Sequence, residues 1–144
     1  MPVTRSATTV WTGTLFEGSG EVTMNSSGIG TYAVNWPARS AEPNGTTSPE
    51  ELIAAAHSSC FSMAFSNGLA NNNTPATTLT TSAAVEFTPG TGITGIALTV
   101  EGVVAGLTEE EFVRLATAAK EGCPVSQALK AVPITLAATL KGQS

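Results

Sequence analysis

Residues 48–64, SPEELIAAAHSSCFSMA, decide the fold, because they specify a helix with a defined start and apolar residues on most of its circumference. Ser48 suits the N-cap, Pro49 suits the first helical position, and Glu51 occupies the capping-box position three residues after the cap. A helix that is apolar nearly all round is buried all round. We therefore predict a central buried helix that begins at Ser48 and ends near Gly68.

Strand and helix patterns flank this helix on both sides. Upstream, β-branched and alternating stretches predict an antiparallel meander of strands over residues 8–12, 21–25 and 31–36, followed by a turn-rich loop over residues 37–47. Downstream, the patterns predict paired strands over residues 79–88 and 93–104, a helix from Thr108 to Gly122, a short helix over residues 123–130 and a strand over residues 134–141. No repeat or linker interrupts the chain, so we expect a single α+β domain over residues 1–144.

Composition limits the classes to which the protein can belong. Its 144 residues are 42% hydrophobic and only 12% charged, which excludes a disordered chain and suggests a surface covered by a second copy. Six scattered basic residues and a net charge of −5 argue against binding to nucleic acid or anionic membranes. No apolar run approaches a membrane span of about 20 residues, and the first residues lack a secretory signal, so we expect a cytoplasmic protein.

The groups capable of chemistry are few: two cysteines, one histidine and no aspartate. Cys60, in the middle of the apolar helix, is either a small buried hydrophobe or a reactive thiol. Cys123 stands at an expected N-cap, where the amides of the following turn would stabilise a thiolate, or it simply follows the chain reversal at Gly122. His57 shares a helix face with Cys60, so it could join both cysteines in a Cys₂His zinc site, form a Cys–His nucleophilic pair, or be bonded within the core or at a subunit contact.

Glu50 and Arg39 form a second candidate group. Glu50 is a natural salt-bridge partner for the arginine that precedes the helix, although a first-turn glutamate also complements the helix dipole. Glu50 lies ten residues before Cys60, roughly 15 Å along the helix axis. The two side chains of one helix cannot touch over that distance. If they serve one site, a second subunit brings them together, which predicts a dimer.

Two segments resemble the OsmC/Ohr family of thiol-dependent hydroperoxide reductases. Residues 48–64 resemble the central helix of that family, and residues 122–130, GCPVSQALK, resemble its second cysteine motif. The chain is similar to the OsmC (osmotically inducible protein C) branch, because the organic-hydroperoxide-resistance branch usually has tyrosine at the position of His57. That branch also carries its arginine in an early strand, where this chain has Glu17 and no arginine nearby.

The resemblance implies a fold and roles for four residues. The fold would be an intertwined α+β homodimer with antiparallel sheets packed around two long central helices. Cys60 would be the peroxidatic cysteine, Cys123 the resolving cysteine, and Arg39 with Glu50 the activating pair. The assignment of Arg39 depends on its position relative to the helix, and Arg5 is the other candidate arginine near the N-terminus.

The activity implied by the resemblance is reduction of organic hydroperoxides, and less efficiently of hydrogen peroxide, to alcohols or water. Cys60 would become a sulfenic acid, Cys123 would condense with it to a disulfide, and a dithiol, with a lipoyl-type dithiol as one candidate, would reduce that disulfide. Neither a cofactor nor a metal is expected. Local chemistry favours Cys123 as the more acidic thiol, whereas the resemblance makes Cys60 the attacking one; a low pKa would suit Cys123 as a leaving group. Two alternatives remain: a non-catalytic dimeric ligand-binding or structural protein, and a Cys₂His zinc hydrolase.

Overall fold

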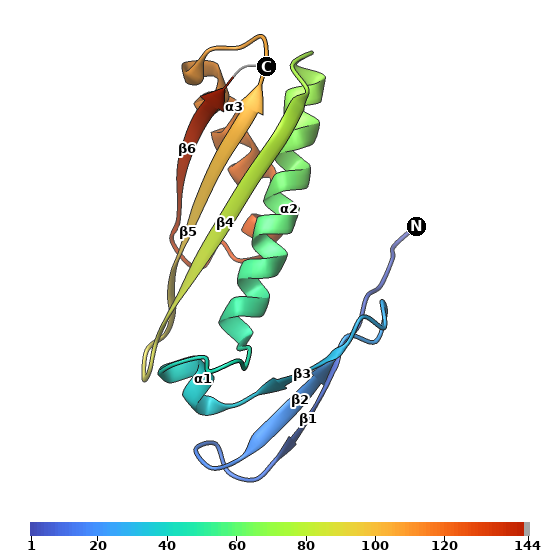
Figure 1. Ribbon diagram of the computed structural model, residues 1–144, viewed down its shortest axis with the longest axis vertical. Helices are drawn as coiled ribbons and strands as arrows, with labels where there is room; N and C mark the ends of the chain where they lie inside the picture. The colour runs from blue at the N-terminus through green and yellow to red at the C-terminus, as the bar shows by residue number, and fades with distance from the viewer. Residues whose placement is uncertain (143–144) are drawn as a thin grey trace. The chain divides into compact units, whose positions relative to one another are not determined.

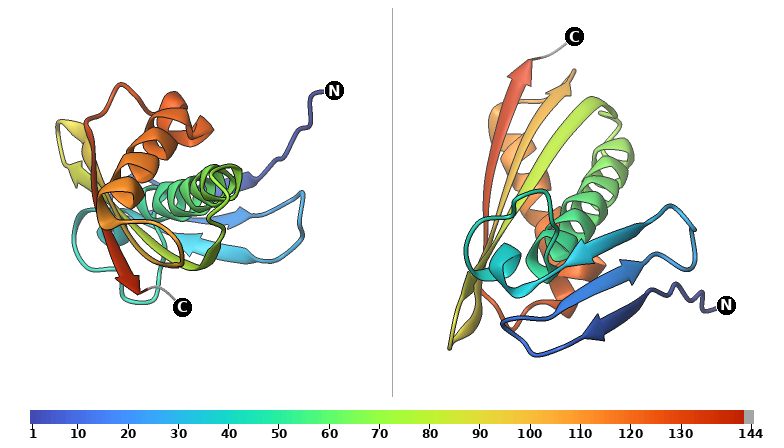
Figure 2. Two further views of the ribbon diagram at one scale, coloured as in Figure 1. Left: turned by 90° about the horizontal axis from the view of Figure 1, so that it is seen from above. Right: turned by 60° about the horizontal axis from the view of Figure 1, so that its bottom comes forward.

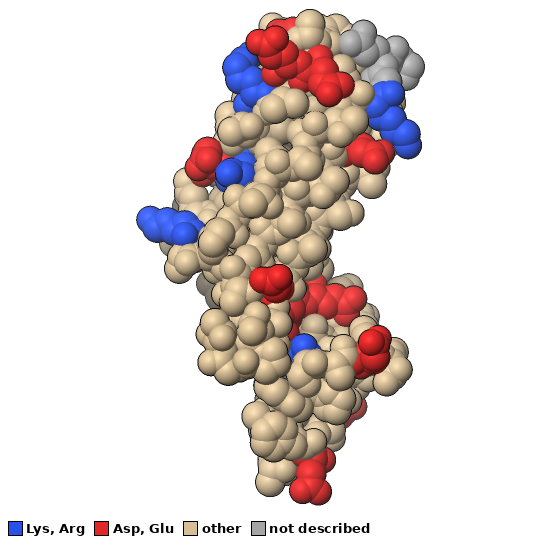
Figure 3. Space-filling view, turned by 90° about the vertical axis from the view of Figure 1, so that its left-hand side faces the viewer, with Lys and Arg blue, Asp and Glu red and all other residues tan. Residues whose placement is uncertain are grey.

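The computed structural model describes residues 1–142, which belong to two compact units, Met1–Leu52 and the residues from Ile53 onward (Figure 1). Each unit contains one three-stranded sheet, with strand orders β1-β2-β3 and β4-β5-β6. Within the described residues, none of the helices has the length and hydropathy needed to cross a lipid bilayer. Charged side chains form small separate groups on the face drawn in Figure 3, as expected from a chain with 12% charged residues.

The first unit begins with the predicted antiparallel meander. Its strands are β1 (Thr8–Thr12), β2 (Ser19–Thr23) and β3 (Thr31–Val34). Both strand pairs are antiparallel. Strand β3 ends two residues before the predicted end at Trp36, because the chain turns there into a short helix.

That short helix, α1 (Trp36–Ser40), corrects the loop predicted over residues 37–47 for its first four residues, whereas residues 41–47 form a loop as predicted. Asn35 caps it: its side-chain oxygen accepts a hydrogen bond from the Ala38 amide at 2.8 Å. Pro37 then occupies the first turn, where its missing N–H leaves no hydrogen bond unmade. Pro37, one of the two prolines that suggested a loop, is therefore also compatible with a helix start, and Arg39 lies in the last turn of α1.

The central helix, α2 (Pro49–Asn71), begins as predicted and extends three residues beyond Gly68. The Ser48 hydroxyl accepts a hydrogen bond from the Glu51 amide at 3.2 Å, whereas the Glu51 carboxylate accepts one from the Thr47 hydroxyl. The predicted capping of the helix by Ser48 is thus confirmed, with Thr47 as the partner of the glutamate side chain.

Burial of α2 differs from the prediction. One stripe of the helix is fully buried, at Phe61, Phe65 and Leu69, which recur every four residues as one helix face requires. On another side Met63 is 73% exposed, although the helix is apolar there too. Within one chain, α2 is therefore buried on one side rather than all round.

The second unit packs two helices on one face of a mixed sheet (Figure 2). Its strands are β4 (Ala76–Thr88), β5 (Gly92–Val104) and β6 (Ile134–Gly142). The β4–β5 hairpin is antiparallel as expected, but β6 pairs with β5 in the parallel direction. The expectation of purely antiparallel sheets is wrong for this strand, because the intervening helices carry the chain back to the end of the sheet where β5 began.

The core of this unit lies between α2, β5 and the helix α3 (Glu109–Gly122). Buried residues alternate along β5, at Ile96, Leu98 and Val100, so one face of the sheet meets the helices. The rings of Phe65 on α2 and Phe112 on α3 pack with their centroids 5.0 Å apart. This core fixes the second cysteine segment, because α3 leads directly into Cys123.

The start of α3 confirms the capping box predicted at Thr108. Its hydroxyl accepts a hydrogen bond from the Glu111 amide at 3.1 Å, and the Glu111 carboxylate accepts one from the Thr108 amide at 3.1 Å. After α3, Cys123 serves as the N-cap residue of α4 (Pro124–Ala128), which ends two residues before the predicted end at Lys130.

Candidate active site

Arg39 and Glu50 form an ion pair in the first unit. The Arg39 Nε lies 3.1 Å and 3.0 Å from the two carboxylate oxygens of Glu50, and Nη2 lies 3.0 Å from Oε2. The Glu50 side chain is 8% exposed and that of Arg39 is 31% exposed. The paired carboxylate holds the guanidinium in a defined orientation, with one side still accessible to solvent.

Both cysteines belong to the second unit and both are free thiols. Cys60, on α2, is partly exposed, whereas Cys123, at the start of α4, is fully buried in the core. The fold brings the two thiols, 63 residues apart in the sequence, close enough that each shifts the pKa of the other. The arrangement therefore offers one thiol that a reagent can reach and a second thiol beside it.

The surroundings shift the pKa values of the two thiols in opposite directions. Burial raises the pKa of Cys60, the Val125 amide partly opposes this, and the Cys123 thiol raises it further. Burial also acts to raise the pKa of Cys123. The polar groups around it, namely the Ser126 amide, Cys60, the Ser126 hydroxyl and the Val125 amide, outweigh burial and lower that pKa below its usual value. Cys123 is the more acidic thiol, as the local sequence predicts.

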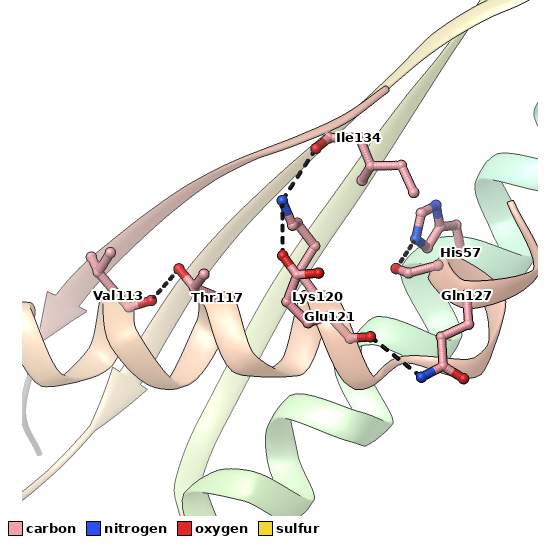
Figure 4. A network of polar contacts seen from close by, with 8 residues as sticks. His57, Val113, Thr117, Lys120, Glu121, Gln127 and Ile134 are labelled. Carbon is pink, nitrogen blue, oxygen red and sulfur yellow. Dashed lines mark hydrogen bonds and ion pairs between the residues drawn. The ribbon is translucent and has the colours of Figure 1, made fainter. Parts of the chain in front are cut away.

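His57 is bonded within the core. Its side chain is fully buried, and Nε2 lies 2.7 Å from the hydroxyl oxygen of Ser126, a contact that joins α2 to α4 (Figure 4). Within the described residues, Nδ1 of His57 is buried and has no hydrogen-bond partner. Burial lowers the pKa of His57, so the imidazole is neutral near pH 7. Of the interpretations open for His57, the structure supports the one in which it is bonded in the core.

Ser126 was not among the residues identified from the sequence. It is buried, its hydroxyl meets His57, and both its amide and its hydroxyl act on Cys123. A signal was nevertheless present, because His57 precedes Cys60 by three residues and Ser126 follows Cys123 by three. This spacing places each polar residue on the same side of its helix as a cysteine.

The zinc alternative finds no support in the geometry. Across residues 1–142, the histidine, cysteine and glutamate side chains do not form a group of three or more that could hold a metal ion. Of the two ring nitrogens of His57 that could bind zinc, Nε2 is directed at Ser126 instead.

Comparisons with known proteins agree with this architecture. The family model described as OsmC-like protein matches residues 42–137. A protein of Escherichia coli (strain K12) named Peroxiredoxin OsmC is 40% identical over 134 residues, which cover 91% of this chain and 92% of that protein.

Solved structures confirm the expected α+β, OsmC-like fold. The organic hydroperoxide resistance protein OhrB of Bacillus subtilis has a TM-score of 0.73 at 25% identity, covering 92% of this chain and 97% of that one. An organic hydroperoxide resistance protein of Legionella pneumophila has a TM-score of 0.70 at 24% identity, covering 94% and 96%. The identity to the Escherichia coli protein, the family match and the shared fold together show that the chain belongs to the OsmC-like family.

Proposed function

We propose that this protein is a thiol-dependent peroxidase that reduces organic hydroperoxides to alcohols, and hydrogen peroxide less efficiently. The observation that carries the proposal is the pair of free thiols, one partly exposed and one fully buried, that the fold brings together in a chain of the OsmC-like family. Relatives named as a peroxiredoxin and as organic hydroperoxide resistance proteins support the same chemistry.

In the oxidative half of the cycle, the Cys60 thiolate attacks the distal oxygen of ROOH. The O–O bond breaks, the alkoxide takes up a proton to become ROH, and Cys60 is left as a sulfenic acid. The Cys123 thiolate then attacks the Cys60 sulfur, and the displaced hydroxide leaves as water after protonation. The product is a Cys60–Cys123 disulfide. The partial exposure of Cys60 and the burial of Cys123 support this division of roles.

Arg39 and Glu50 have the properties needed to activate Cys60. The pKa of Cys60 is raised by burial, so its thiolate needs a nearby cation at neutral pH. The Arg39 guanidinium is held by Glu50 through contacts of 3.0–3.1 Å and keeps 31% of its side chain exposed. In the proposal, this guanidinium stabilises the Cys60 thiolate and the oxygen that leaves the peroxide.

We further propose that the active protein is a homodimer in which residues 1–144 of each chain act as one OsmC-like domain. The support lies in the apolar side of α2 that one chain leaves exposed, at Met63 for example. A second copy packed on this side would bury it. A cytoplasmic location accords with the two free thiols, which a reducing compartment maintains.

A dithiol returns the disulfide to two thiols. A dithiol suits this step because its second thiol resolves the mixed disulfide formed by the first. A lipoyl-type dithiol is the first candidate to test against glutathione, which has one thiol.

Free-thiol titration with non-reducing mass spectrometry tests the function. Samples are measured before and after one equivalent of an alkyl hydroperoxide, for the wild-type protein and for Cys60→Ser and Cys123→Ser. We expect rapid loss of both thiols with a Cys60–Cys123 crosslink in the wild type, and a trapped sulfenic acid only where Cys60 remains. Two thiols that persist in excess peroxide would refute the proposal and leave a non-catalytic binding or structural protein.

A further inference from the structure

His57 and Ser126 form a buried contact beside the thiol pair that the proposed chemistry above does not use. Both residues are nearly or fully buried, and 2.7 Å separates His57 Nε2 from Ser126 Oγ. A histidine buried in this way is costly as mere packing, because one of its ring nitrogens, Nδ1, has no partner within residues 1–142. A phenylalanine or leucine would fill a similar volume without that cost. The presence of histidine therefore indicates that its imidazole has a chemical role.

The unpartnered nitrogen assigns the tautomer of His57. An orphaned N–H group is rarer in protein interiors than an acceptor with an unused lone pair. We therefore place the lone pair on Nδ1 and the hydrogen on Nε2, which donates to the Ser126 oxygen. Since that oxygen now accepts from His57, the serine's own hydrogen is available to a different acceptor. The acceptor that we assign to it is the sulfur of Cys123, the N-cap residue three positions earlier, because this spacing places both side chains at the same side of the helix start and the Ser126 hydroxyl acts to lower the pKa of Cys123.

We propose that His57, through Ser126, positions a hydroxyl group to donate a hydrogen bond to the Cys123 sulfur and so stabilises Cys123 as the thiolate that leaves when the Cys60–Cys123 disulfide is reduced. In this proposal Ser126 donates to a reacting atom and so acts as a catalytic residue, and His57 is a positioning residue. This inference rests on the proposed function. It gives His57 and Ser126 a role in the reductive half of the cycle, in which the disulfide returns to two thiols.

The reductive step follows from which sulfur a reductant can reach. Cys123 is fully buried and Cys60 is partly exposed, so the thiolate of an external dithiol attacks the sulfur of Cys60. A bond forms between that reductant sulfur and Cys60, the Cys60–Cys123 bond breaks, and its electron pair leaves on Cys123. The second thiol of the reductant then attacks the mixed disulfide and releases Cys60. The reductant is oxidised to its disulfide, and its two protons end on the two protein thiols.

Of the neighbouring ionisable groups, Cys60 helps to lower the pKa of Cys123, whereas His57 and Lys120 do not. Cys60 on α2 acts on Cys123, whereas His57 contacts Ser126 and is kept neutral by burial. In the last turn of α3, Lys120 is directed at the Ile134 carbonyl, 3.3 Å away, and at Glu121, 3.6 Å away (Figure 4). The pKa of Cys123 is lowered by the Ser126 amide, by Cys60 and by the Ser126 hydroxyl, in that order, against the effect of burial. In a Cys60→Ser background, the Ser126 hydroxyl is the remaining contribution that a side-chain substitution can remove.

The first test is the titration of Cys123, followed by thiolate absorbance near 240 nm, in a Cys60→Ser background. Ser126→Ala should raise the pKa of Cys123 by about one unit, the effect of losing one hydrogen bond to a charged group. Ser126→Thr, which keeps the hydroxyl, should restore it. Ser62→Ala is the matched control, because that hydroxyl makes a part-buried bond of 2.7 Å to Thr81 instead. A Ser126→Ala shift no larger than that of Ser62→Ala would overturn the proposal.

The second test is the rate at which a dithiol reduces the disulfide, prepared with diamide so that no peroxidase activity is required. Ser126→Ala and His57→Phe should each slow this reduction by about threefold to tenfold relative to Ser62→Ala. An unchanged rate in His57→Phe would show that the histidine only packs. Failure of the wild-type protein to react with peroxide would count against the proposed function, whereas these two tests would still report on Cys123.

The third test needs no substitution. Nitrogen-15 NMR of the wild-type protein distinguishes the two neutral tautomers of its single histidine. We expect the hydrogen on Nε2. A hydrogen on Nδ1 would make Ser126 the donor to His57, leave no hydroxyl hydrogen for Cys123, and overturn the relay.

Discussion

Replacing Glu50 by glutamine tests whether the paired carboxylate holds Arg39, as the geometry of the pair indicates. The substitution keeps the shape of the side chain and removes its charge. Arg39 makes three contacts with the carboxylate, at 3.0, 3.0 and 3.1 Å. In glutamine one oxygen becomes an NH₂ group that cannot accept a hydrogen bond, so one or two of the three contacts are lost. The remaining contacts are made to a neutral oxygen.

The size of the effect follows from these contacts and from burial. Hydrogen bonds to charged groups contribute about 1.5–3 kcal/mol each, and neutral ones about 0.5–1.5 kcal/mol. Breaking a fully buried ion pair by removing one partner costs about 3–5 kcal/mol. Because 31% of the Arg39 side chain is exposed, water offsets part of that cost. We expect the free energy of unfolding to fall by about 1–3 kcal/mol and the rate of Cys60 oxidation by an alkyl hydroperoxide to fall by about tenfold.

Urea unfolding and stopped-flow thiol loss measure the two quantities on the same preparations. Glu51→Gln is the matched control, since Glu51 is the exposed neighbour in the same helical turn and accepts from Thr47. It should change stability by no more than about 0.5 kcal/mol. If Glu50→Gln matches Glu51→Gln in both measurements, the energetic reasoning is wrong. If stability falls while the oxidation rate is unchanged, the pair is structural and Arg39 does not activate Cys60.

Four further outcomes are expected. Phe65→Ala empties a fully buried site between α2 and Phe112 and should lower the free energy of unfolding by about 3–5 kcal/mol in urea titrations. Gly102→Ala would set a Cβ 2.5 Å from the Phe112 ring and should cost about 1–3 kcal/mol in the same assay. Burial lowers the pKa of His57 below its ordinary value of 6.5, so the unfolded chain binds more protons than the folded one as the pH falls through 6.5. Stability should therefore decline below that pH, and urea midpoints at pH 7.5 and 5.5 should differ less in His57→Phe. Incubation with EDTA should leave peroxide consumption unchanged, and a loss of activity would reopen the zinc alternative.

Local sequence patterns predicted the structure correctly where a few neighbouring residues determine it. The start of α2 at Ser48 and the capping box at Thr108 each depend on side chains within four residues of each other. The same local chemistry predicted a lower pKa for Cys123 than for Cys60. The incorrect prediction of a loop at α1 also has a local cause. An asparagine followed by Trp-Pro is compatible with both a turn and a capped helix.

Contacts and strand directions that depend on residues far apart in the sequence could not be predicted from local patterns. The parallel direction of β6 depends on where α3 and α4 return the chain, and the strand's own residues carry no signal of direction. The contact between His57 and Ser126 joins residues 69 positions apart, so the pattern around either residue does not reveal it. The apolar circumference of α2 predicted burial without specifying what covers it, and within one chain part of it stays uncovered.

The opposite shifts of the two thiol pKa values also bear on where the activating cation comes from. Burial and Cys123 raise the pKa of Cys60, and the Val125 amide is the group that opposes them. A peroxidatic Cys60 therefore requires a positive charge that α2, α4 and their core do not supply. The pair of Arg39 and Glu50 can supply it, but Glu50 lies about 15 Å from Cys60 along α2. If Arg39 activates Cys60 while Glu50 holds it, the arginine must act on the cysteine of a second chain, and peroxidase activity should then disappear as the protein is diluted below the dissociation constant of its dimer.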